Sequence, residues 1–501
     1  MNRRNHHHRV IAALLVLVVA AASAYGQAPQ GPRPENIKYP PLDFKPPKPA
    51  EFRSVLSNGL IVYIAEDHEI PWFEASLFMR TGPFLEPPDK LGVEDMTPNI
   101  MREGGTTAMN GEDITERMDF LAGNVSATRL SLHMRHMDEG LKIWLDILNN
   151  PAFPEDKIRR ARETQLVGIR NRNKNISQVA GRTFARLVYG ENSPMAAEPT
   201  EATMNGIVRD DLVRWHQKYW GANNAVLVVA GDFRKAEMLK KIENTFGKWR
   251  KAEKAVPAIP KVEQAAKAGV YIVQPEVIPN QGIIRIGHLG IKQDDPDYPA
   301  VNLMNYILGG GSFSSRITRT VRSNYGLAYS TSSSFAGGIL YPGTFAAFCQ
   351  TKNSTVVFAA QLMLNEIEGM RDSPVSREDL EFAKTARINA FPSMFGSISQ
   401  LIGNFARLEF DGRPMDYYDT YISRYEKLTV EDIKRMADKY LRPDKMIIMV
   451  AGNIAECRAG ADKMLPNQAA IDAMAAKFGG RTIDGLAKKY GDGTVTIIPL
   501  K

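Results

Sequence analysis

Outside the N-terminal segment, His133 and His136 form the closest pair of residues that commonly bind metals. Two neutral imidazoles on one face of an element are a frequent part of a zinc site. Residues 126–130, which precede the pair, have the pattern of a β-strand. Side chains three positions apart in a strand point to opposite faces, so we expect two ordinary strand histidines and no shared metal.

Cys349 and Cys457 are the only cysteines of the chain. Cys349 ends an apolar segment, residues 344–349, that is typical of a strand. A thiol in such a place is usually free and inert, and we favour this interpretation. One disulfide between the two residues is the alternative, because an exported chain reaches an oxidising compartment.

The N-terminus has the three parts of a secretory signal. Basic residues come first, an apolar run follows at residues 10–22, and Ala22, Ser23 and Ala24 form a small-x-small cleavage pattern. The run is too short to span a bilayer comfortably, and no similar run occurs later. We predict a signal peptide, a periplasmic or extracellular location and no stable membrane span; an uncleaved anchor is the alternative.

Length and composition indicate a folded protein of more than one domain. The chain has 501 residues, of which 44% are hydrophobic and 24% charged, close to globular averages. Its net charge is +7, but Arg3, Arg4 and Arg9 lie in the predicted signal, which has no acid, so the mature chain carries +4. The other basic residues are spread among acids, so nucleic-acid binding is not expected.

Two proline-bearing stretches divide the chain. The first predicts an extended lead-in, and the second, which contains Pro257 and Pro260, predicts an interdomain linker. Each of the two long segments that remain has about 200 residues, a usual domain size. The predicted order is a signal peptide at 1–24, a lead-in at 25–50, a first domain at 51–250, a linker at 251–267, a second domain at 268–460 and a C-terminal extension at 461–501.

The two long segments repeat one pattern. Asp211 opens a helical pattern that leads to an apolar strand ending at Gly231, and Asp432 opens a matching pattern that ends at Gly452. Asp, Arg, Lys, Tyr, Val, Ala and Gly residues match in register, as in a tandem duplication. Strands and helices do not strictly alternate, so we predict an α+β fold with two homologous tandem domains.

Three motifs of the first segment, at residues 80–88, 91–93 and 104–107, resemble the N-terminal domain of the pitrilysin/insulinase zinc metallopeptidases. In active members a helix among these motifs carries H-x-x-E-H, whose histidines bind zinc and whose glutamate activates water. The resemblance covers nearly all of residues 51–460. It implies two domains of the mitochondrial-processing-peptidase-like metallohydrolase type.

The zinc motif itself is missing. Asp95 stands in place of the first histidine, Pro98 in place of the glutamate and Asn99 in place of the second histidine. The resemblance places the third ligand, a glutamate on a later helix, at Gly168. A catalytic zinc site typically needs three strong protein ligands, and Pro98 supplies no base and tends to kink a helix. We therefore expect no metal and no cofactor in this chain.

The second segment keeps its share of the family's site. Residues 308–316 and 320–330 resemble the C-terminal domain, in which an arginine and a tyrosine with six residues between them face the zinc site. Arg322 and Tyr329 match this pair in type and spacing. A guanidinium and a phenol can both donate hydrogen bonds to the oxyanion of a tetrahedral intermediate. The preceding triple glycine is not a phosphate loop, because it lacks the Lys-Ser/Thr ending.

The resemblance implies the non-zinc subunit of a heteromeric metallopeptidase. In some members of the family one subunit has the zinc motif and the other supplies the arginine–tyrosine pair. This chain would then be inactive alone and would act in trans on peptide substrates, with a related partner that has H-x-x-E-H and holds the zinc. One alternative is a catalytically inactive peptide-binding or scaffold protein of the same fold; another is a peptidase with an unrecognised metal site.

Overall fold

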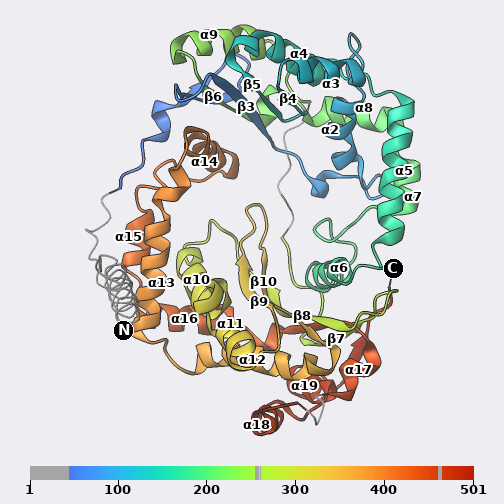
Figure 1. The fold of residues 1–501 in the computed structure, drawn as a ribbon, viewed down its shortest axis with the longest axis vertical. Coiled ribbons are helices and arrows are strands. Elements are labelled where there is room, and N and C mark those ends of the chain that lie inside the picture. Colours follow the sequence, from blue (N-terminus) through green and yellow to red (C-terminus); the bar gives the residue numbers. More distant parts are fainter. Residues whose placement is uncertain (1–43, 254–258, 260, 461–464, 501) are drawn as a thin grey trace, which may run out of the picture. The chain divides into compact units, whose positions relative to one another are not determined.

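The computed structural model of the chain describes residues 44–253, 259, 261–460 and 465–500. The predicted signal peptide, most of the lead-in and part of the linker lie outside these residues. The fold described below concerns the unit that begins at Lys45, in which helices surround two mixed sheets (Figure 1).

The first sheet has the strand order β1-β2-β6-β3-β5-β4. In it β2 and β6 pair in parallel, with Ile61 opposite Val226, and the other pairs are antiparallel. Its strands are β1 (Arg53–Val55), β2 (Ile61–Glu66), β3 (Trp72–Met79), β4 (Asn124–Val125), β5 (Arg129–His133) and β6 (Ala225–Gly231).

The second sheet has the order β12-β7-β11-β8-β10-β9. Here β7 and β11 pair in parallel, with Gly269 opposite Ile447, while β11, β8, β10 and β9 follow one another in antiparallel pairs. Its strands are β7 (Gly269–Val273), β8 (Gln281–Leu289), β9 (Ser330–Ala336), β10 (Thr344–Lys352), β11 (Ile447–Ala451) and β12 (Val495–Ile497).

The five strands that follow β1 and β12 have the same order and the same pairing directions in both sheets. The strand that ends at Gly231 and the strand that precedes Gly452 each lie between a parallel and an antiparallel neighbour. The predicted α+β fold with two homologous tandem halves is therefore confirmed. The exact domain boundaries stay a prediction; the last helix of the first half ends at Phe246, and β7 begins at Gly269.

Helices flank both sheets. Those of the first half are α2 (Val93–Glu103), α3 (Gly111–Phe120), α4 (Met137–Asn149), α5 (Glu155–Asn171), α6 (Ile176–Tyr189), α7 (Glu201–Gly206), α8 (Arg209–Tyr219) and α9 (Lys235–Phe246). Those of the second half are α10 (Tyr298–Asn305), α11 (Arg316–Thr318), α12 (Val356–Asp372), α13 (Arg377–Ala390), α14 (Ile398–Asp411), α15 (Tyr421–Glu426), α16 (Val430–Tyr440), α17 (Ile454–Ala459), α18 (Gln468–Phe478) and α19 (Ile483–Tyr490).

Helix α6, which belongs to the first half, packs on the sheet of the second half (Figure 1). Strand β11 is buried along its whole length, and its side chains alternate between two cores because the strand period is two. Ile447 and Met449 share one core with Val179 and Phe184 of α6, whereas Ile448 and Val450 belong to the large core on the other face. The second sheet thus needs a helix from the first half to cover one face.

Helix α14 makes the reciprocal contact. It belongs to the second half and packs against β2 and β6 of the first sheet. Its Phe405 is fully buried, with its ring 5.9 Å from that of Phe52, and Phe410 lies 6.0 Å from Phe78. The two halves therefore exchange equivalent helices, since α6 follows α5 and α14 follows α13.

Polar bonds fix the orientation of α14 on the first sheet. Glu409 accepts hydrogen bonds from Arg53 Nε at 2.7 Å and from the Tyr63 hydroxyl at 3.2 Å. The Ser399 hydroxyl donates to Glu74 at 3.0 Å. Burial, together with the charge of Glu409, raises the pKa of Tyr63, so this phenol stays a neutral donor.

The C-terminal extension belongs to the second half. Strand β12 adds to the edge of the second sheet, with Val495 opposite Val270. Ile471, Phe478 and Leu486 are buried in the large second core. Over the residues that the structure describes, no helix combines the length and the apolar character needed to cross a membrane.

The helix exchange predicts a stability effect at Phe405. Replacing this buried ring by alanine (Phe405→Ala) should leave a cavity between α14 and the first sheet and destabilise the protein by about 3–5 kcal/mol. Phe382→Ala is the matched control, because Phe382 on neighbouring α13 is 54% exposed. Chemical and thermal unfolding monitored by circular dichroism measures both variants. Equal effects at the two positions would contradict the packing described here.

Candidate functional site

The degenerate zinc motif lies on helix α2, whose N-terminus is capped by a carboxylate from a preceding loop. One oxygen of Glu86 accepts the backbone N–H groups of Gly92 and Glu94, both at 2.8 Å. These are N–H groups at a helix start that have no partner within the helix, and the helix dipole favours a negative charge there. The sequence motifs around residues 80–93 therefore have a local structural task that does not require zinc.

The three altered positions form contacts of their own. Asn99 donates its side-chain amide to the carbonyl of Asp95 at 2.9 Å, one helical turn away. The Asp95 carboxylate accepts a hydrogen bond from Gln165 of α5 at 3.0 Å. Pro98 lies inside α2, which continues to Glu103. The carbonyl of Glu94 loses the backbone donor that a residue other than proline would supply.

Gly168 lies on α5, the helix that contacts α2. It follows Gln165 by three residues, which places the two positions on neighbouring parts of one helix face. A Cβ added at Gly168 would meet no atom within 4 Å. The assignment of Gly168 to the third ligand position stays a prediction, and the open space leaves room for a larger side chain there.

The acids near α2 repel one another. Burial raises the pKa of Glu86, against the opposing effect of its two backbone hydrogen bonds, and the charges of Glu94 and Asp95 raise it further. Burial also raises the pKa of Glu94. In the described ranges of the chain, no three His, Cys, Asp or Glu residues are grouped so that they could hold a metal ion.

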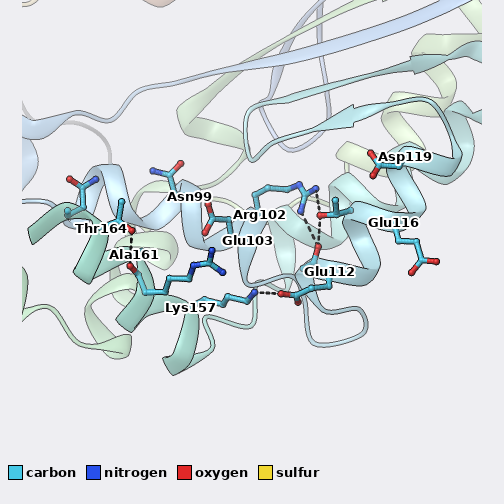
Figure 2. A pocket seen from close by; sticks show the side chains of 13 residues that line it. Asn99, Arg102, Glu103, Glu112, Glu116, Asp119, Lys157, Ala161 and Thr164 are labelled. Atoms are coloured by element: carbon cyan, nitrogen blue, oxygen red, sulfur yellow. Dashed lines mark hydrogen bonds and ion pairs between the residues drawn. The ribbon is translucent and has the colours of Figure 1, made fainter. Parts of the chain in front are cut away.

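A cavity of ≈ 1010 Å³ opens beside the altered motif, between α2, α3 and α5 (Figure 2). Its wall is highly charged, but several of the charges are already paired. Lys157 forms an ion pair with Glu112, and Arg102 donates to the Val125 carbonyl at 2.9 Å and to Thr115 at 3.1 Å. Histidine and cysteine are absent from its lining, and its acids form no group of described residues that could hold a metal ion.

Arg322 and Tyr329 are brought together by a tight turn in the second half. Arg322 lies on the π-helical turn η8 (Arg319–Asn324), and Tyr329 immediately precedes β9. Gly326 between them has a φ of +63°, a left-handed conformation that glycine adopts without strain. Arg322 Nη1 then donates to the Tyr329 carbonyl at 2.9 Å.

Phe313 completes this group, and the sequence analysis gave it no role. It lies on the short turn η7 (Ser312–Ser314) within the glycine-rich motif. The Arg322 guanidinium lies 4.4 Å from the Phe313 ring centre and 4.5 Å from that of Tyr329. Phe313 is 62% exposed and Tyr329 is 84% exposed. The available signal in the sequence was an aromatic residue within the glycine-rich motif, nine positions before the arginine.

The glycine run before Phe313 packs closely rather than forming an open turn. Gly309 ends the buried part of the π-helical turn η6 (Tyr306–Gly310), and a Cβ there would lie 2.5 Å from the Ser333 backbone nitrogen of β9. Two hydrogen bonds stabilise this contact between η6 and β9. Asn305 donates to the Ser333 carbonyl at 3.0 Å and accepts from the Ser333 hydroxyl at 2.7 Å. This contact holds the loop that carries Phe313.

Among the described residues, the histidines and cysteines form no group that could hold a metal ion. Strand β5 ends at His133, and His136 lies in the following 3₁₀ turn, so our placement of both in one strand was wrong. The nitrogens of this pair bond to Arg135 instead. Cys349 and Cys457 are buried and free, as favoured, and burial raises the pKa of each thiol to about 12.

Comparisons with known proteins show what the chain is similar to. Residues 206–387, which include Arg322 and Tyr329, match the Peptidase M16 inactive domain. The chain is 21% identical to a protein named "Non-peptidase homolog YmxG" from Helicobacter pylori, over 78% of this chain and 91% of that one. It is 24% identical to an "Uncharacterized zinc protease" from Rickettsia bellii, over 66% of this chain and 81% of that one.

Solved structures agree. A peptidase M16 inactive domain from Pseudomonas fluorescens has 25% identity and a TM-score of 0.71, with 82% of this chain and 99% of that one covered. A protease from Helicobacter pylori has 17% identity and a TM-score of 0.72, with 82% and 100% covered.

The chain thus resembles the M16, or insulinase-like, peptidases, and its residues 206–387 match the inactive domain of that family. The relatives carry both non-peptidase and zinc-protease names. The names of the matched domain and of the Helicobacter pylori relative fit a chain without zinc.

The retained contact between α2 and α5 predicts that the zinc site can be rebuilt. The unaltered chain should purify with substoichiometric zinc. Asp95→His, Pro98→Glu and Asn99→His together should create weak zinc binding, and Gly168→Glu added to these should tighten it at least about tenfold by supplying a third ligand. Metal analysis and calorimetric titration with zinc measure these effects.

Gly181→Glu is the matched control for Gly168→Glu, because Gly181 is also a helical glycine with open space around it. It should not tighten zinc binding in the triple variant. One firmly held zinc per unaltered chain would contradict the loss of the site. If Gly168→Glu does not raise the zinc affinity of the triple variant, the third ligand position is not at residue 168.

Proposed function

We propose that the chain is the non-zinc subunit of a heteromeric, exported zinc metallopeptidase. It is inactive alone, works in the periplasm or outside the cell, and supplies Arg322 and Tyr329 to the active site of a related subunit. That partner carries the intact H-x-x-E-H motif and the zinc. The fold of the M16 family and the altered zinc motif of this chain support a role that requires such a partner.

The exposed group of Phe313, Arg322 and Tyr329 carries the proposal. Two aromatic rings more than half exposed, with a guanidinium between them, leave apolar surface in water that a bound chain would cover. Aromatic residues and arginine are the side chains that contribute most at binding surfaces. This supports contact with a peptide.

The chemistry of the pair suits peptide-bond cleavage. One of the five N–H donors of Arg322 is used on the Tyr329 carbonyl, which fixes the guanidinium while other donors remain. Attack of a zinc-bound water on a peptide carbonyl places negative charge on its oxygen. Donors held in advance at that position, Arg322 and the Tyr329 hydroxyl, would stabilise this charge without reorganising.

A peptide-binding or scaffold protein without a peptidase partner is the second candidate. The name of the Helicobacter pylori relative, a non-peptidase homologue, favours it. In that case the exposed group would bind peptides without acting on them.

Arg322→Ala separates these functions in a mixed complex with the zinc subunit. Subunit association and zinc content should not change, whereas kcat/KM should fall by about 10²–10³, roughly 3 kcal/mol of transition-state stabilisation, because the oxyanion loses a charged donor. Tyr329→Phe should act in the same direction and be less than additive with Arg322→Ala, since both residues serve one oxyanion.

Arg319→Ala is the matched control, because Arg319 lies on the same turn and is exposed. It should leave kcat/KM within about twofold of the unaltered complex. An undiminished kcat/KM for the double variant of Arg322 and Tyr329 would favour the scaffold function instead.

A further inference from the structure

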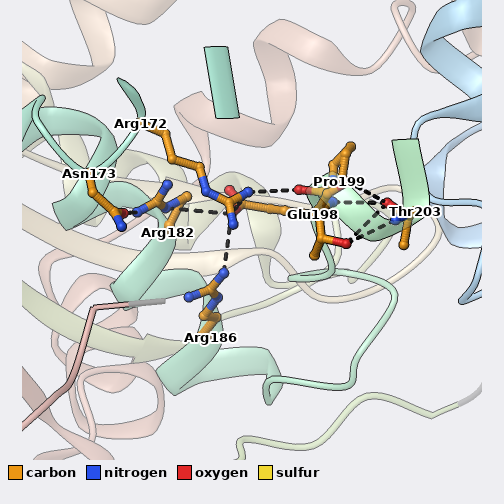
Figure 3. Close-up of polar contacts among 8 residues, drawn as sticks. Arg172, Asn173, Arg182, Arg186, Glu198, Pro199 and Thr203 are labelled. Carbon is orange, nitrogen blue, oxygen red and sulfur yellow. Dashed lines mark hydrogen bonds and ion pairs between the residues drawn. The ribbon is translucent and has the colours of Figure 1, made fainter. Parts of the chain in front are cut away.

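Three arginines converge on one glutamate where helices α5 and α6 meet (Figure 3). The Glu198 oxygen Oε2 lies 3.7 Å from Arg172 Nη1, 3.5 Å from Arg182 Nε and 3.3 Å from Arg186 Nη2. All three guanidinium groups therefore face the same carboxylate oxygen, which cannot neutralise them all.

The backbone fixes the arginines in this arrangement. Arg172 follows the last residue of α5 and donates to the Pro199 carbonyl at 2.7 Å. Arg182 and Arg186 lie one turn apart on α6, which places them on one face of that helix. Arg182 also donates to the Asn173 side chain at 2.5 Å. These contacts position the cluster independently of any ligand.

Arg182 is the least satisfied member. Its side chain is only 10% exposed, and its Nε and Nη1 make no hydrogen bond with any residue that the structure describes. Burial and the charges of Arg172 and Arg186 lower its pKa against the effect of Glu198, although arginine stays protonated. A buried charged donor without an acceptor is costly, and an anion that accepts from it would remove this cost.

A cavity of ≈ 220 Å³ lies against this cluster. On its polar side are Arg182, Arg186 and the buried Thr183, and Glu191 lies at its exposed rim. The other lining residues are apolar: Leu187, Ile498, Pro499 and Leu500.

The charges and the size limit the ligand. Three guanidinium groups stand against two carboxylates, Glu198 and Glu191, so a single negative charge restores balance. The cavity is smaller than the roughly 300–1,000 Å³ of sites for drug-sized molecules. It therefore suits one carboxylate with one short apolar group attached, and guanidinium groups bind carboxylates through paired, charge-assisted hydrogen bonds.

We propose that this cavity binds the C-terminal carboxylate of a peptide whose last side chain is apolar. Arg182 and Arg186 hold the carboxylate, and the last side chain lies against Leu187 and Leu500. The site extends the proposed function, on which it rests for its peptide ligand, from the reacting peptide bond to the end of the substrate.

Calorimetric titration of the full chain tests the site with two probes that differ only at their end. The probes are N-acetyl-Gly-Ala-Leu with a free carboxylate and the same peptide as a C-terminal amide. The acid should bind at least about tenfold more tightly, because the amide lacks the charge that the guanidinium groups pair with. This difference should shrink as the salt concentration rises.

Arg186→Gln should abolish most of the difference between the two probes. Arg186 is more exposed than Arg182, so this variant keeps the buried contacts of the cluster, whereas Arg182→Gln removes some of them. Arg170→Gln is the matched control, because Arg170 pairs with exposed Glu201 and does not line the cavity. Thermal unfolding checks that each variant is folded.

Equal binding of the acid and the amide by the unaltered chain would overturn the proposal. The proposal would also fail if the difference in affinity between the two probes persisted in Arg186→Gln and in an Arg182→Gln variant that is shown to be folded. Inorganic phosphate is the third probe. If the chain binds phosphate but does not bind the acid peptide, the cavity is a phosphate site and the proposal is overturned. Arg322→Ala should keep the full preference for the acid. If Arg322→Ala leaves kcat/KM of the mixed complex unchanged, the proposed function is refuted while this site is untouched. If the unaltered chain binds acid and amide equally, this site is refuted while the proposed function is untouched.

Discussion

Burial of both faces of each sheet is the constraint on which the rest of the molecule depends. A strand such as β6 or β11, buried at every position, needs apolar cover on two sides. In each half the helices between the strands cover one face only, and the second face is covered by α14 or α6 from the other half. This exchange fixes where α5 lies, because α5 leads into α6, and with it the three arginines around Glu198. It also fixes the hydrogen bonds of Glu409, which lies on α14.

The packing of α2 in this chain does not require the residues of the zinc motif. Helix α2 has a capped start and contacts α5, although positions 95, 98 and 99 lack the histidines and the glutamate of the zinc motif. The second half keeps an arginine and a tyrosine in contact, with Phe313 against the guanidinium. The packing of α2 on α5 therefore does not depend on the residue types of the zinc motif.

The sequence predicted the repeat, and with it the matching strand orders, because buried strands and capped helices have local signatures at Asp211 and Asp432. Local patterns could not predict the exchange of α6 and α14, since an amphipathic helix shows that it has an apolar face and not which sheet covers it. The arginine cluster escaped detection because positions 172, 182, 186 and 198 meet only after two helices and a loop have folded.

The helix exchange also sets an order of events during synthesis. Helix α14 follows β6 by roughly 170 residues, so ribosomes adding about 5–20 residues per second complete the first sheet roughly 10–30 s before its cover exists. Through that interval Val226 and Val228, whose neighbours Leu227 and Val229 point into the opposite core, face solvent as part of an apolar strip. A first half without α14 therefore exposes this apolar strip, and we expect a chain that ends before α14 to aggregate rather than to form a smaller working protein.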